Sequence, residues 1–298
     1  MALEKAIYYD ASKCSGCKGC QVACKQWNQL ASPLYAEDYE FTGSYESPLE
    51  NDSNTWLHMT FDEHEGEGPK DFVWAFGRDA CHHCTEAGCV MACPTGACHH
   101  VENGAVVIDP DICIGCKFCE TGCPYHIPKF SSVEHIERKC WFCMDRLDQG
   151  RRPACVDSCT THALDFGDRE QMVALGRARV EQIKDKYPKA YLYGDTELGG
   201  LHVLDVLPLG PESVGLPADP SIPLFRVGSN VLKPAAGIGF AATLAVLAAA
   251  RINGRGYHRD ADALKYDPVT DDTIVVGRIN QVGFESAELE EEAIDDER

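Results

Sequence analysis

The chain has 298 residues, a formal net charge of −20 at pH 7 and 17 cysteines. A chain of this length can bury a sizeable core without disulfide staples, and its acidity excludes nucleic acid as a natural partner. Sixteen cysteines fall into four groups of four, and only Cys98 stands outside them. This arrangement predicts four sites that each hold a metal centre with four thiolates.

The N-terminal segment leads directly into the first cysteine group. It contains no charged n-region, apolar h-region or cleavage site, so we expect no cleavable signal peptide. Residues Ala6 to Tyr9 predict a short strand before the group, and Gln21 to Leu30 predict a helix that leaves it. The group has gaps of two, two and three residues and consists of Cys14, Cys17, Cys20 and Cys24.

An inserted region without cysteines, residues 31–80, separates the first group from the second. It is rich in aromatic residues, and Thr55–Phe61 and Asp71–Phe76 predict a β-hairpin around a polar turn. One interpretation makes this hairpin a side sheet that covers a cluster. The other makes it a docking surface for a large partner, because interface cores are enriched in aromatic residues.

The second and third groups lie close together and form a predicted inner module, residues 81–130. Between the groups, Ala97–Val101 and Ala105–Ile108 predict a hairpin with an Asn-Gly turn. A cysteine loop, a short helix and a hairpin before a second cysteine loop is the layout of a two-cluster bacterial ferredoxin. The two groups consist of Cys81, Cys84, Cys89 and Cys93, and of Cys113, Cys116, Cys119 and Cys123.

The spacing of the third group is that of an iron–sulfur ligand run, with three thiolates for one cubane and a fourth directed elsewhere. Gly115 within it is expected to let the backbone approach the sulfides closely. Disulfides are disfavoured because cysteines so close in sequence pair poorly, whereas a zinc site stays open as the alternative. We expect Cys98 to be a buried free thiol. Four histidines are expected at the surface or beside a cluster rather than as ligands, namely His82, His83, His99 and His100.

The fourth group has a gap of eleven residues between its second and third cysteines and consists of Cys140, Cys143, Cys155 and Cys159. The gap contains Arg146, Arg151 and Arg152, which are suited to lie near an anionic cluster. Ala163–Phe166 then predicts a strand. This strand closes a predicted outer module built from residues 1–30 and 131–167.

Residues 168–230 are expected to cover the modules. Asp168 is predicted to cap a helix that runs to about Lys186 and covers a cluster module. Ala190–Tyr193 and Leu201–Val206 predict further strands, and five prolines after residue 207 mark an extended linker.

An apolar segment, residues 231–252, contains an uncharged stretch from Pro234 to Ala250. As a helix this stretch is about 25 Å long, against about 30 Å for a bilayer core. A transmembrane helix and an alanine-rich soluble helix both stay open, and small residues suit packing against a partner's membrane helix. Arginines after the segment favour a cytoplasmic C-terminus with the cluster modules on the opposite side. Residues 253–298 form an acidic tail that we expect to be solvated and disordered.

The four groups must be paired, because the fourth cysteine of one ferredoxin run binds the cluster of the other run. The adjacent second and third groups pair, and the first and fourth pair across the chain. The sets predict four [4Fe-4S] clusters and an α+β fold of two fused dicluster ferredoxin-like modules, with the inserted hairpin and a C-terminal helix. The sequence contains no evident nucleophile, acid–base pair or substrate motif, so we expect a conductor of electrons that is not itself an enzyme. The predicted iron ligands are Cys14, Cys17, Cys20 and Cys159; Cys24, Cys140, Cys143 and Cys155; Cys81, Cys84, Cys89 and Cys123; and Cys93, Cys113, Cys116 and Cys119.

The order and spacing of all four groups resemble the four-cluster iron–sulfur subunits of molybdopterin oxidoreductases. Four segments are similar to the β subunit of membrane-bound formate dehydrogenase: Gly16–Asn28, Cys123–Pro128, Pro153–Val156 and Lys233–Thr243. The resemblance implies that electrons from formate oxidation at a separate molybdenum or tungsten pterin subunit cross four [4Fe-4S] clusters. A membrane cytochrome b or similar acceptor would then receive them.

The resemblance also implies export of the folded chain with a partner that bears a twin-arginine signal. The cluster modules would then be periplasmic and membrane-associated, with a cytoplasmic location as the alternative. The sequence departs from the ferredoxin pattern at Lys25 and Thr160, which follow fourth cysteines in place of proline. Two other functions stay open. One is the same electron-transfer role in a hydrogenase or a sulfur, polysulfide or sulfoxide reductase, and the other is a zinc-stabilised structural scaffold.

Overall fold

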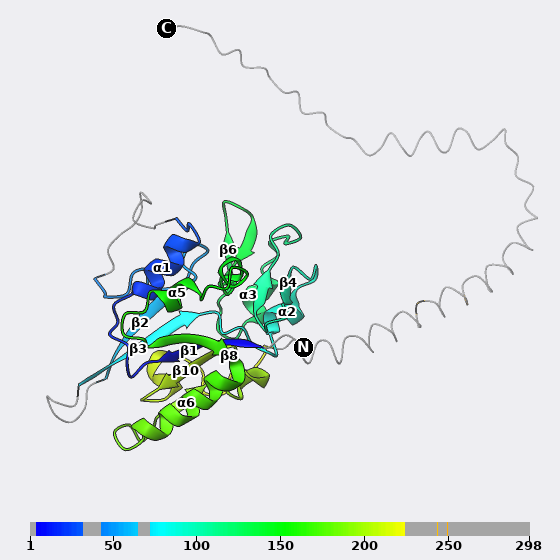
Figure 1. The fold of residues 1–298 in the computed structure, drawn as a ribbon. Coiled ribbons are helices and arrows are strands. Elements are labelled where there is room, and N and C mark those ends of the chain that lie inside the picture. Colours follow the sequence, from blue (N-terminus) through cyan, green and yellow to red (C-terminus); the bar gives the residue numbers. More distant parts are fainter. Residues whose placement is uncertain (1–3, 32–42, 65–71, 224–242, 244–248, 250–298) are drawn as a thin grey trace, which may run out of the picture. The chain divides into compact units, whose positions relative to one another are not determined.

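The structure, a computed structural model, describes residues 4–31, 43–64, 72–223, 243 and 249 (Figure 1). The chain divides into two compact units, Met1–Val231 and Leu232–Arg298, and the elements described here belong to the first. In chain order they are β1 (Lys5–Asp10), α1 (Gly19–Trp27), β2 (Leu57–His64), β3 (Val73–Ala80), α2 (Gly88–Ala92), β4 (Cys98–His100), β5 (Val106–Ile108), α3 (Phe118–Gly122), β6 (Lys129–Ser131), β7 (Ile136–Arg138), α4 (Met144–Leu147), α5 (Ala154–Asp157), β8 (Leu164–Asp168), α6 (Arg169–Ile183), β9 (Tyr191–Tyr193), the 3₁₀ turn η2 (Glu197–Gly199), β10 (Val203–Leu207) and the 3₁₀ turn η3 (Pro211–Val214).

A four-stranded sheet in the order β8-β1-β10-β9 joins the two ends of this unit. β1 is antiparallel to β8 and parallel to β10, and β9 is antiparallel to β10. All four strands were predicted, and their ends differ from the predicted ones by at most two residues. The position of β10 was not predicted. A strand from the region expected only to cover the modules lies inside the sheet, beside the first strand of the chain.

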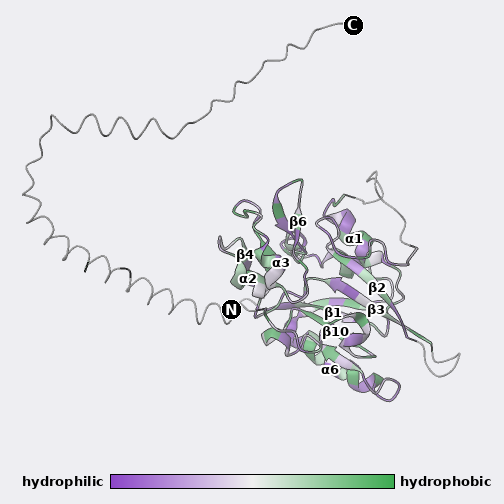
Figure 2. Ribbon diagram, turned by 180° about the vertical axis from the view of Figure 1, so that it is seen from behind, coloured by the Kyte–Doolittle hydropathy of each residue, from purple (hydrophilic) through white to green (hydrophobic). Residues whose placement is uncertain are grey.

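The residues of β1 alternate between two layers, as a strand requires. Ile7 and Tyr9 belong to a buried core that also contains cysteines of the first and fourth groups. Ala6 and Tyr8 belong to a second core that includes the inner face of α6. Figure 2 shows the hydrophobic residues along β1 and β10 between these layers. The sheet therefore separates the cysteine-bearing side of the unit from the α6 side.

Helix α6 packs against β1, β8, β9 and β10. Val173 and Ile183 are buried in this contact, which confirms the predicted apolar face. The helix covers the side of the sheet away from the cysteines, and two strands of that sheet, β1 and β8, come from the predicted outer module. Asp168 occupies the predicted N-cap position, but its side chain forms no capping hydrogen bond. The carboxylate of Asp168 instead accepts a hydrogen bond from Lys5 Nζ at 2.5 Å.

The predicted inserted hairpin consists of the antiparallel strands β2 and β3. Leu57 and Met59 are buried in the core shared with the first and fourth cysteine groups. The rings of Phe61 and Phe76 approach the first cysteine loop so closely that a Cβ at Gly16 would lie 2.8 Å from each. The described part of the hairpin thus covers a cysteine group, as one of the two interpretations expected. Residues 65–71, in the predicted turn, lie outside the described residues.

Two short hairpins complete the cysteine-bearing side. The hairpin β4–β5 is confirmed where the Asn-Gly turn predicted it, whereas β6–β7 was not predicted. Apart from Thr243 and Ala249, the predicted segment 231–252 and the tail 253–298 lie outside the described residues. Among the residues that are described, no helix is both long and apolar enough to cross a membrane.

Candidate cluster-binding sites

Four cysteines from two segments that are far apart in the sequence line one small cavity. Cys14 and Cys17 lie in the loop between β1 and α1, and Cys20 lies in the first turn of α1. Cys159 comes from the loop between α5 and β8, and its side chain lines the same cavity as the other three. Burial raises the pKa of Cys14, and the neighbouring thiols of Cys159 and Cys17 raise it further. The structure therefore brings the last cysteine of the fourth group to the first three of the first group.

The last cysteine of the first group, Cys24, lies beside cysteines of the fourth group. Cys24 is buried on α1, which packs against α5. Burial raises the pKa of Cys24 well above its usual value, and the thiols of Cys140, Cys155 and Cys143 raise it further. These neighbours are the first three cysteines of the fourth group. Cys24 therefore lies beside the first three cysteines of the fourth group, and Cys159 lies beside the first three of the first group.

The second cysteine group gathers around the last cysteine of the third. Burial raises the pKa of Cys84 well above its usual value, and the nearby thiols of Cys81, Cys123 and Cys89 raise it further. Cys81 and Cys123 also share a buried cluster with Ile127. Three cysteines from one loop and one from the next are therefore neighbours here as well.

The remaining cysteines lie around the short helices α2 and α3, which pack against each other. Cys93 follows α2 directly, and Cys113 and Cys116 precede α3. Burial raises the pKa of Cys119 on α3, and Cys113 is among the charged neighbours that add to this rise. The packing of the two helices connects Cys93 with the loop that carries the other three.

Backbone N–H groups point at several of these sulfurs. Leu164 N–H donates to Cys159 Sγ at 3.4 Å, and Cys98 N–H donates to Cys93 Sγ at 3.3 Å. Such bonds favour the thiolate, which is the form that binds iron. In the described residues no three His, Cys, Asp or Glu side chains converge closely enough for a single metal ion. A cubane needs a wider spacing, because each thiolate binds a different iron, so the all-thiol sets and their N–H donors fit [4Fe-4S] clusters.

The structure gives a reason for glycine at position 115 that differs from the predicted one. The φ angle of Gly115 is +63°, a backbone conformation that is strained for a residue with a Cβ atom. A Cβ there would lie 2.3 Å from the carbonyl oxygen of His135 and 2.8 Å from the ring of Phe130. The β6–β7 hairpin, rather than the inorganic core alone, therefore leaves no room for a side chain at this position.

Two buried cations near the cysteines were not predicted. Arg78 on β3 is 5% exposed, and its Nε and Nη1 have no hydrogen-bond partner in the described part of the chain. Burial lowers the pKa of Arg78, but the thiols of Cys155 and Cys140 outweigh this, so the pKa is raised. Lys139 is 4% exposed, and its Nζ donates to the carbonyl oxygen of Cys140 at 3.0 Å. The only sequence signal for either was that Lys139 directly precedes a cysteine.

The three arginines of the long gap contact Asp157 and Trp27. Arg146 forms an ion pair with Asp157 and donates to the carbonyl oxygen of Arg152 at 2.7 Å. Its guanidinium also lies over the ring of Trp27, 4.4 Å from the centroid, and that of Arg151 lies 5.2 Å from it. Arg152 binds Asp157 at 3.0 Å. These contacts hold the loop between Cys143 and Cys155 in shape.

The two histidines of the second group are buried rather than at the surface. His83 is fully buried, and its Nδ1 accepts a hydrogen bond from Val106 N–H at 3.0 Å. The ring of His202 is bonded to the carbonyl oxygen of His83 at 2.7 Å. Burial lowers the pKa of His82 to about 4, which leaves this ring neutral at pH 7. These rings are uncharged packing and hydrogen-bonding groups between the sheet and the cysteine loops.

The cysteine outside the four groups also has a partner. Cys98 is 2% exposed, which confirms its predicted burial. Its side chain forms a hydrogen bond with Cys89, and this bond is the largest cause that lowers the pKa of Cys89 to about 7. Cys98 therefore acts as a hydrogen-bond donor to a predicted ligand.

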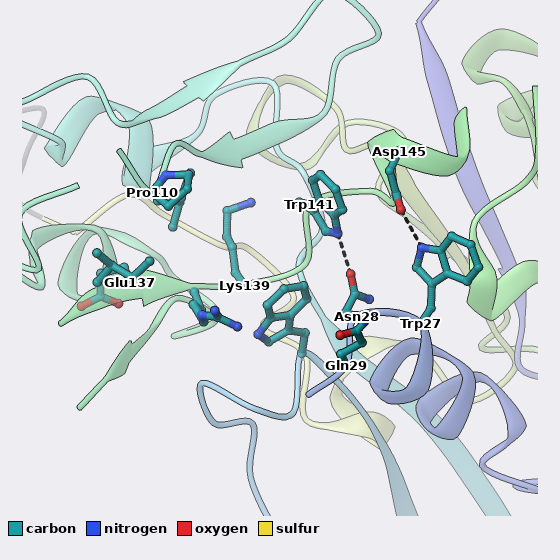
Figure 3. A pocket seen from close by; sticks show the side chains of 12 residues that line it. Trp27, Asn28, Gln29, Pro110, Glu137, Lys139, Trp141 and Asp145 are labelled. Carbon is teal, nitrogen blue, oxygen red and sulfur yellow. Dashed lines mark hydrogen bonds between the residues drawn. The ribbon is translucent and has the colours of Figure 1, made fainter. Parts of the chain in front are cut away.

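A cavity of about 420 Å³ lies beside the C-terminal end of α1 (Figure 3). Three indole rings line it, those of Trp27, Trp56 and Trp141. Trp141 Nε1 donates to Asn28 Oδ1 at 2.7 Å. The amide nitrogen of Asn28 in turn lies 2.8 Å from the carbonyl oxygen of Cys24 and 3.8 Å from its Sγ. Because Trp141 occupies the amide oxygen, the N–H groups of Asn28 must face the cysteine.

Comparison with known families identifies the class of protein that this geometry defines. Two family profiles, each described as a 4Fe-4S dicluster domain, match residues 13–97 and 72–169. Together with the four thiol sets they define an iron–sulfur protein of the dicluster ferredoxin type, with places for four [4Fe-4S] clusters.

Similar proteins narrow this class. The chain is 40% identical over 242 residues to the formate dehydrogenase iron-sulfur subunit of Haemophilus influenzae, a match that covers 79% of this chain and 76% of the relative. It is 39% identical over 250 residues to the nitrate-inducible formate dehydrogenase iron-sulfur subunit of Escherichia coli, covering 82% and 83%. Identity to a subunit of the anaerobic dimethyl sulfoxide reductase of E. coli is 34% over 173 residues, covering 58% and 77%. The chain belongs to the family of formate dehydrogenase iron–sulfur subunits.

Proposed function

We propose that this chain is the electron-transfer subunit of a formate dehydrogenase complex. It accepts electrons from a molybdenum or tungsten pterin subunit and delivers them to a membrane cytochrome b or another acceptor. Family membership supports the formate-oxidising partner. The observation that supports the arrangement of the clusters is the placement of Cys159 beside the first group and of Cys24 beside the fourth. Two-cluster ferredoxins exchange their fourth ligands in the same way.

Each proposed cluster is held by three cysteines of one run and the fourth of its partner run. When bound, a [4Fe-4S] cluster takes up and releases one electron, and the surrounding hydrogen bonds and burial set its potential. The chain's own residues hold the sulfurs, exclude water and direct N–H groups at them. The proposed ligand sets are Cys14, Cys17, Cys20 and Cys159; Cys24, Cys140, Cys143 and Cys155; Cys81, Cys84, Cys89 and Cys123; and Cys93, Cys113, Cys116 and Cys119.

The four sets follow one another in a row. Neighbouring sets interact through three pairs of thiols, which are Cys20 with Cys155, Cys140 with Cys81, and Cys119 with Cys89. The set of Cys14 is therefore one end of the row and the set of Cys113 is the other. Such a row conducts single electrons between two partners, and we propose no catalytic role for the chain itself.

The proposed domain organisation follows this row. Residues 1–30 and 131–167 form the outer module, which the antiparallel pairing of β1 with β8 supports. Residues 81–130 form the inner module, with the insert 31–80 and the covering region 168–230 around them. We further propose that residues 231–252 cross a membrane, with periplasmic modules and a cytoplasmic tail over 253–298. The uncharged stretch from Pro234 to Ala250 supports the membrane segment.

Purification of the complex tests the proposal. A tagged chain should bring down a large pterin-containing subunit, and formate should reduce an artificial dye only when both subunits are present. The chain should carry about sixteen iron atoms and sixteen acid-labile sulfides. Co-purification of a large subunit that oxidises hydrogen but not formate would overturn the assignment to formate dehydrogenase.

A second candidate function is the same electron-transfer role in a complex with a different catalytic partner. The similarity to a dimethyl sulfoxide reductase subunit favours a sulfoxide reductase, although it covers less of this chain than the formate dehydrogenase matches do. Reduction of a sulfoxide by the purified complex, without oxidation of formate, is the result that selects it. The two dicluster matches count against a zinc-stabilised scaffold.

A further inference from the structure

Lys139 occupies the place where two cysteine sets meet. It lies between β7 and Cys140 and is 4% exposed. Its ammonium donates to the carbonyl oxygens of Cys140, at 3.0 Å, and of Val106. The ammonium also lies near enough to Cys81 to lower the pKa of that thiol, against the rise that burial causes. An ammonium has three N–H donors, so the two carbonyl oxygens leave one donor that the backbone does not take.

The two cysteines that Lys139 contacts belong to different sets. Cys140 is a proposed ligand of the set that contains Cys24, and Cys81 of the set that contains Cys84. Cys81 and Cys140 lie in one buried cluster. None of the ion pairs among the described residues involves Lys139. The charge of this lysine is therefore balanced by the two sets and not by a carboxylate.

We propose that Lys139 is a counter-cation shared by the two adjacent clusters at the middle of the row, and that it raises the reduction potentials of both. Four thiolates make each cluster site anionic, and reduction adds another negative charge. A buried positive charge stabilises the reduced form more strongly than an exposed one, because water does not screen it. This inference rests on the proposed ligand sets and therefore on the proposed function.

The shared position has a consequence that a contact with one cluster would not have. Lys139 is bonded to the backbone of Cys140 in one set, and its charge acts on the thiol of Cys81 in the other, so it influences both sites at once. Removal of the charge should lower two potentials together and leave the outer two clusters nearly unchanged. A lysine that only held its loop in place would change cluster content or stability, but would leave the potentials of the assembled clusters where they were.

The test is a redox titration of the purified complex followed by electron paramagnetic resonance. Lys139→Gln removes the charge and Lys139→Arg keeps it, while Lys184→Gln removes an exposed lysine just after the C-terminal end of α6 as the matched control. For Lys139→Gln we expect at least a tenfold loss in the reduction equilibrium of two clusters, which is about 59 mV for a one-electron couple. We expect little change for Lys139→Arg and none for Lys184→Gln. Four unchanged potentials in Lys139→Gln, or a shift of one cluster only, would overturn the proposal.

A second measurement uses the unmutated protein and so does not depend on how a variant folds. Protein grown with ¹⁵N-lysine is reduced and examined by pulsed paramagnetic resonance. We expect a lysine nitrogen coupled to two of the clusters, and the absence of such a coupling contradicts the inference. A wild-type protein without iron or cluster signals would instead refute the proposed function, so the two failures are distinguishable.

Discussion

Replacement of Gly115 by alanine tests how tightly the third cysteine loop is held by the β6–β7 hairpin. Gly115 and Gly96 both have positive φ angles, +63° and +74°. A Cβ at Gly96 would meet nothing within 4 Å, whereas at Gly115 it would lie 2.3 Å from the backbone oxygen of His135. Gly96→Ala is therefore the matched control for the backbone strain alone.

The expected magnitudes follow from these two terms. The left-handed conformation costs an alanine roughly 1–2 kcal/mol at either position. Gly115→Ala adds an overpacking cost of about 1–3 kcal/mol, because a carbonyl in a hairpin cannot rotate away from the new methyl group. We expect Gly96→Ala to lower the free energy of unfolding by about 1–2 kcal/mol and Gly115→Ala by about 2–5 kcal/mol.

Denaturant unfolding of the cluster-loaded protein measures this difference, and iron analysis accompanies it. Because Gly115 lies between Cys113 and Cys116, the shift of its loop should also weaken one cluster signal in the Gly115→Ala protein. Equal losses of stability in the two variants would mean that the contact with His135 has no effect and would contradict this prediction.

Three further predictions concern single side chains. Asn28→Leu removes the N–H groups aimed at a cysteine sulfur and should lower the potential of that cluster by up to roughly 59 mV. Trp141→Phe only frees the side-chain amide of Asn28 to rotate, so it should shift the potential of the same cluster in the same direction but by less. Burial lowers the pKa of His202 below its usual 6.5, so its contribution to stability is complete above pH 6.5 and is lost as the pH falls. Unfolding measured from pH 7 to 5 should therefore show a shallower loss for His202→Gln than for the wild type, and parallel curves would contradict this. Cys159→Ala should lose or alter one cluster, about a quarter of the iron, while Cys98→Ala should keep all four cluster signals; an intact set of four in Cys159→Ala would contradict the pairing.

Much of the cysteine arrangement could be predicted from the spacing of the cysteines along the sequence. Each run begins with a gap of two residues and ends with a gap of three. The ferredoxin rule of exchanged fourth cysteines predicts Cys159 beside Cys14 and Cys24 beside Cys140, and the structure has these thiols as neighbours. The strands that flank the runs were also predictable, because short apolar segments bounded by cysteine loops have few alternatives.

The features that were missed depend on contacts between remote segments. The place of β10 beside β1 brings together residues about two hundred positions apart, and no local pattern encodes that pairing. The same holds for Arg78, which lies in an inserted strand but faces cysteines of the fourth group. The contacts of the arginines in the long gap, with Asp157 and Trp27, were also missed, because Trp27 lies in a distant segment of the chain.

Reduction of the chain's clusters by formate in the purified complex is the decisive measurement of the proposed electron-transfer role. We expect about sixteen iron atoms per chain and four reducible cluster signals that appear on addition of formate. These signals should be absent when the chain is separated from its large subunit. A chain that lacks iron, or one whose clusters stay oxidised in a complex that oxidises formate, would contradict this role.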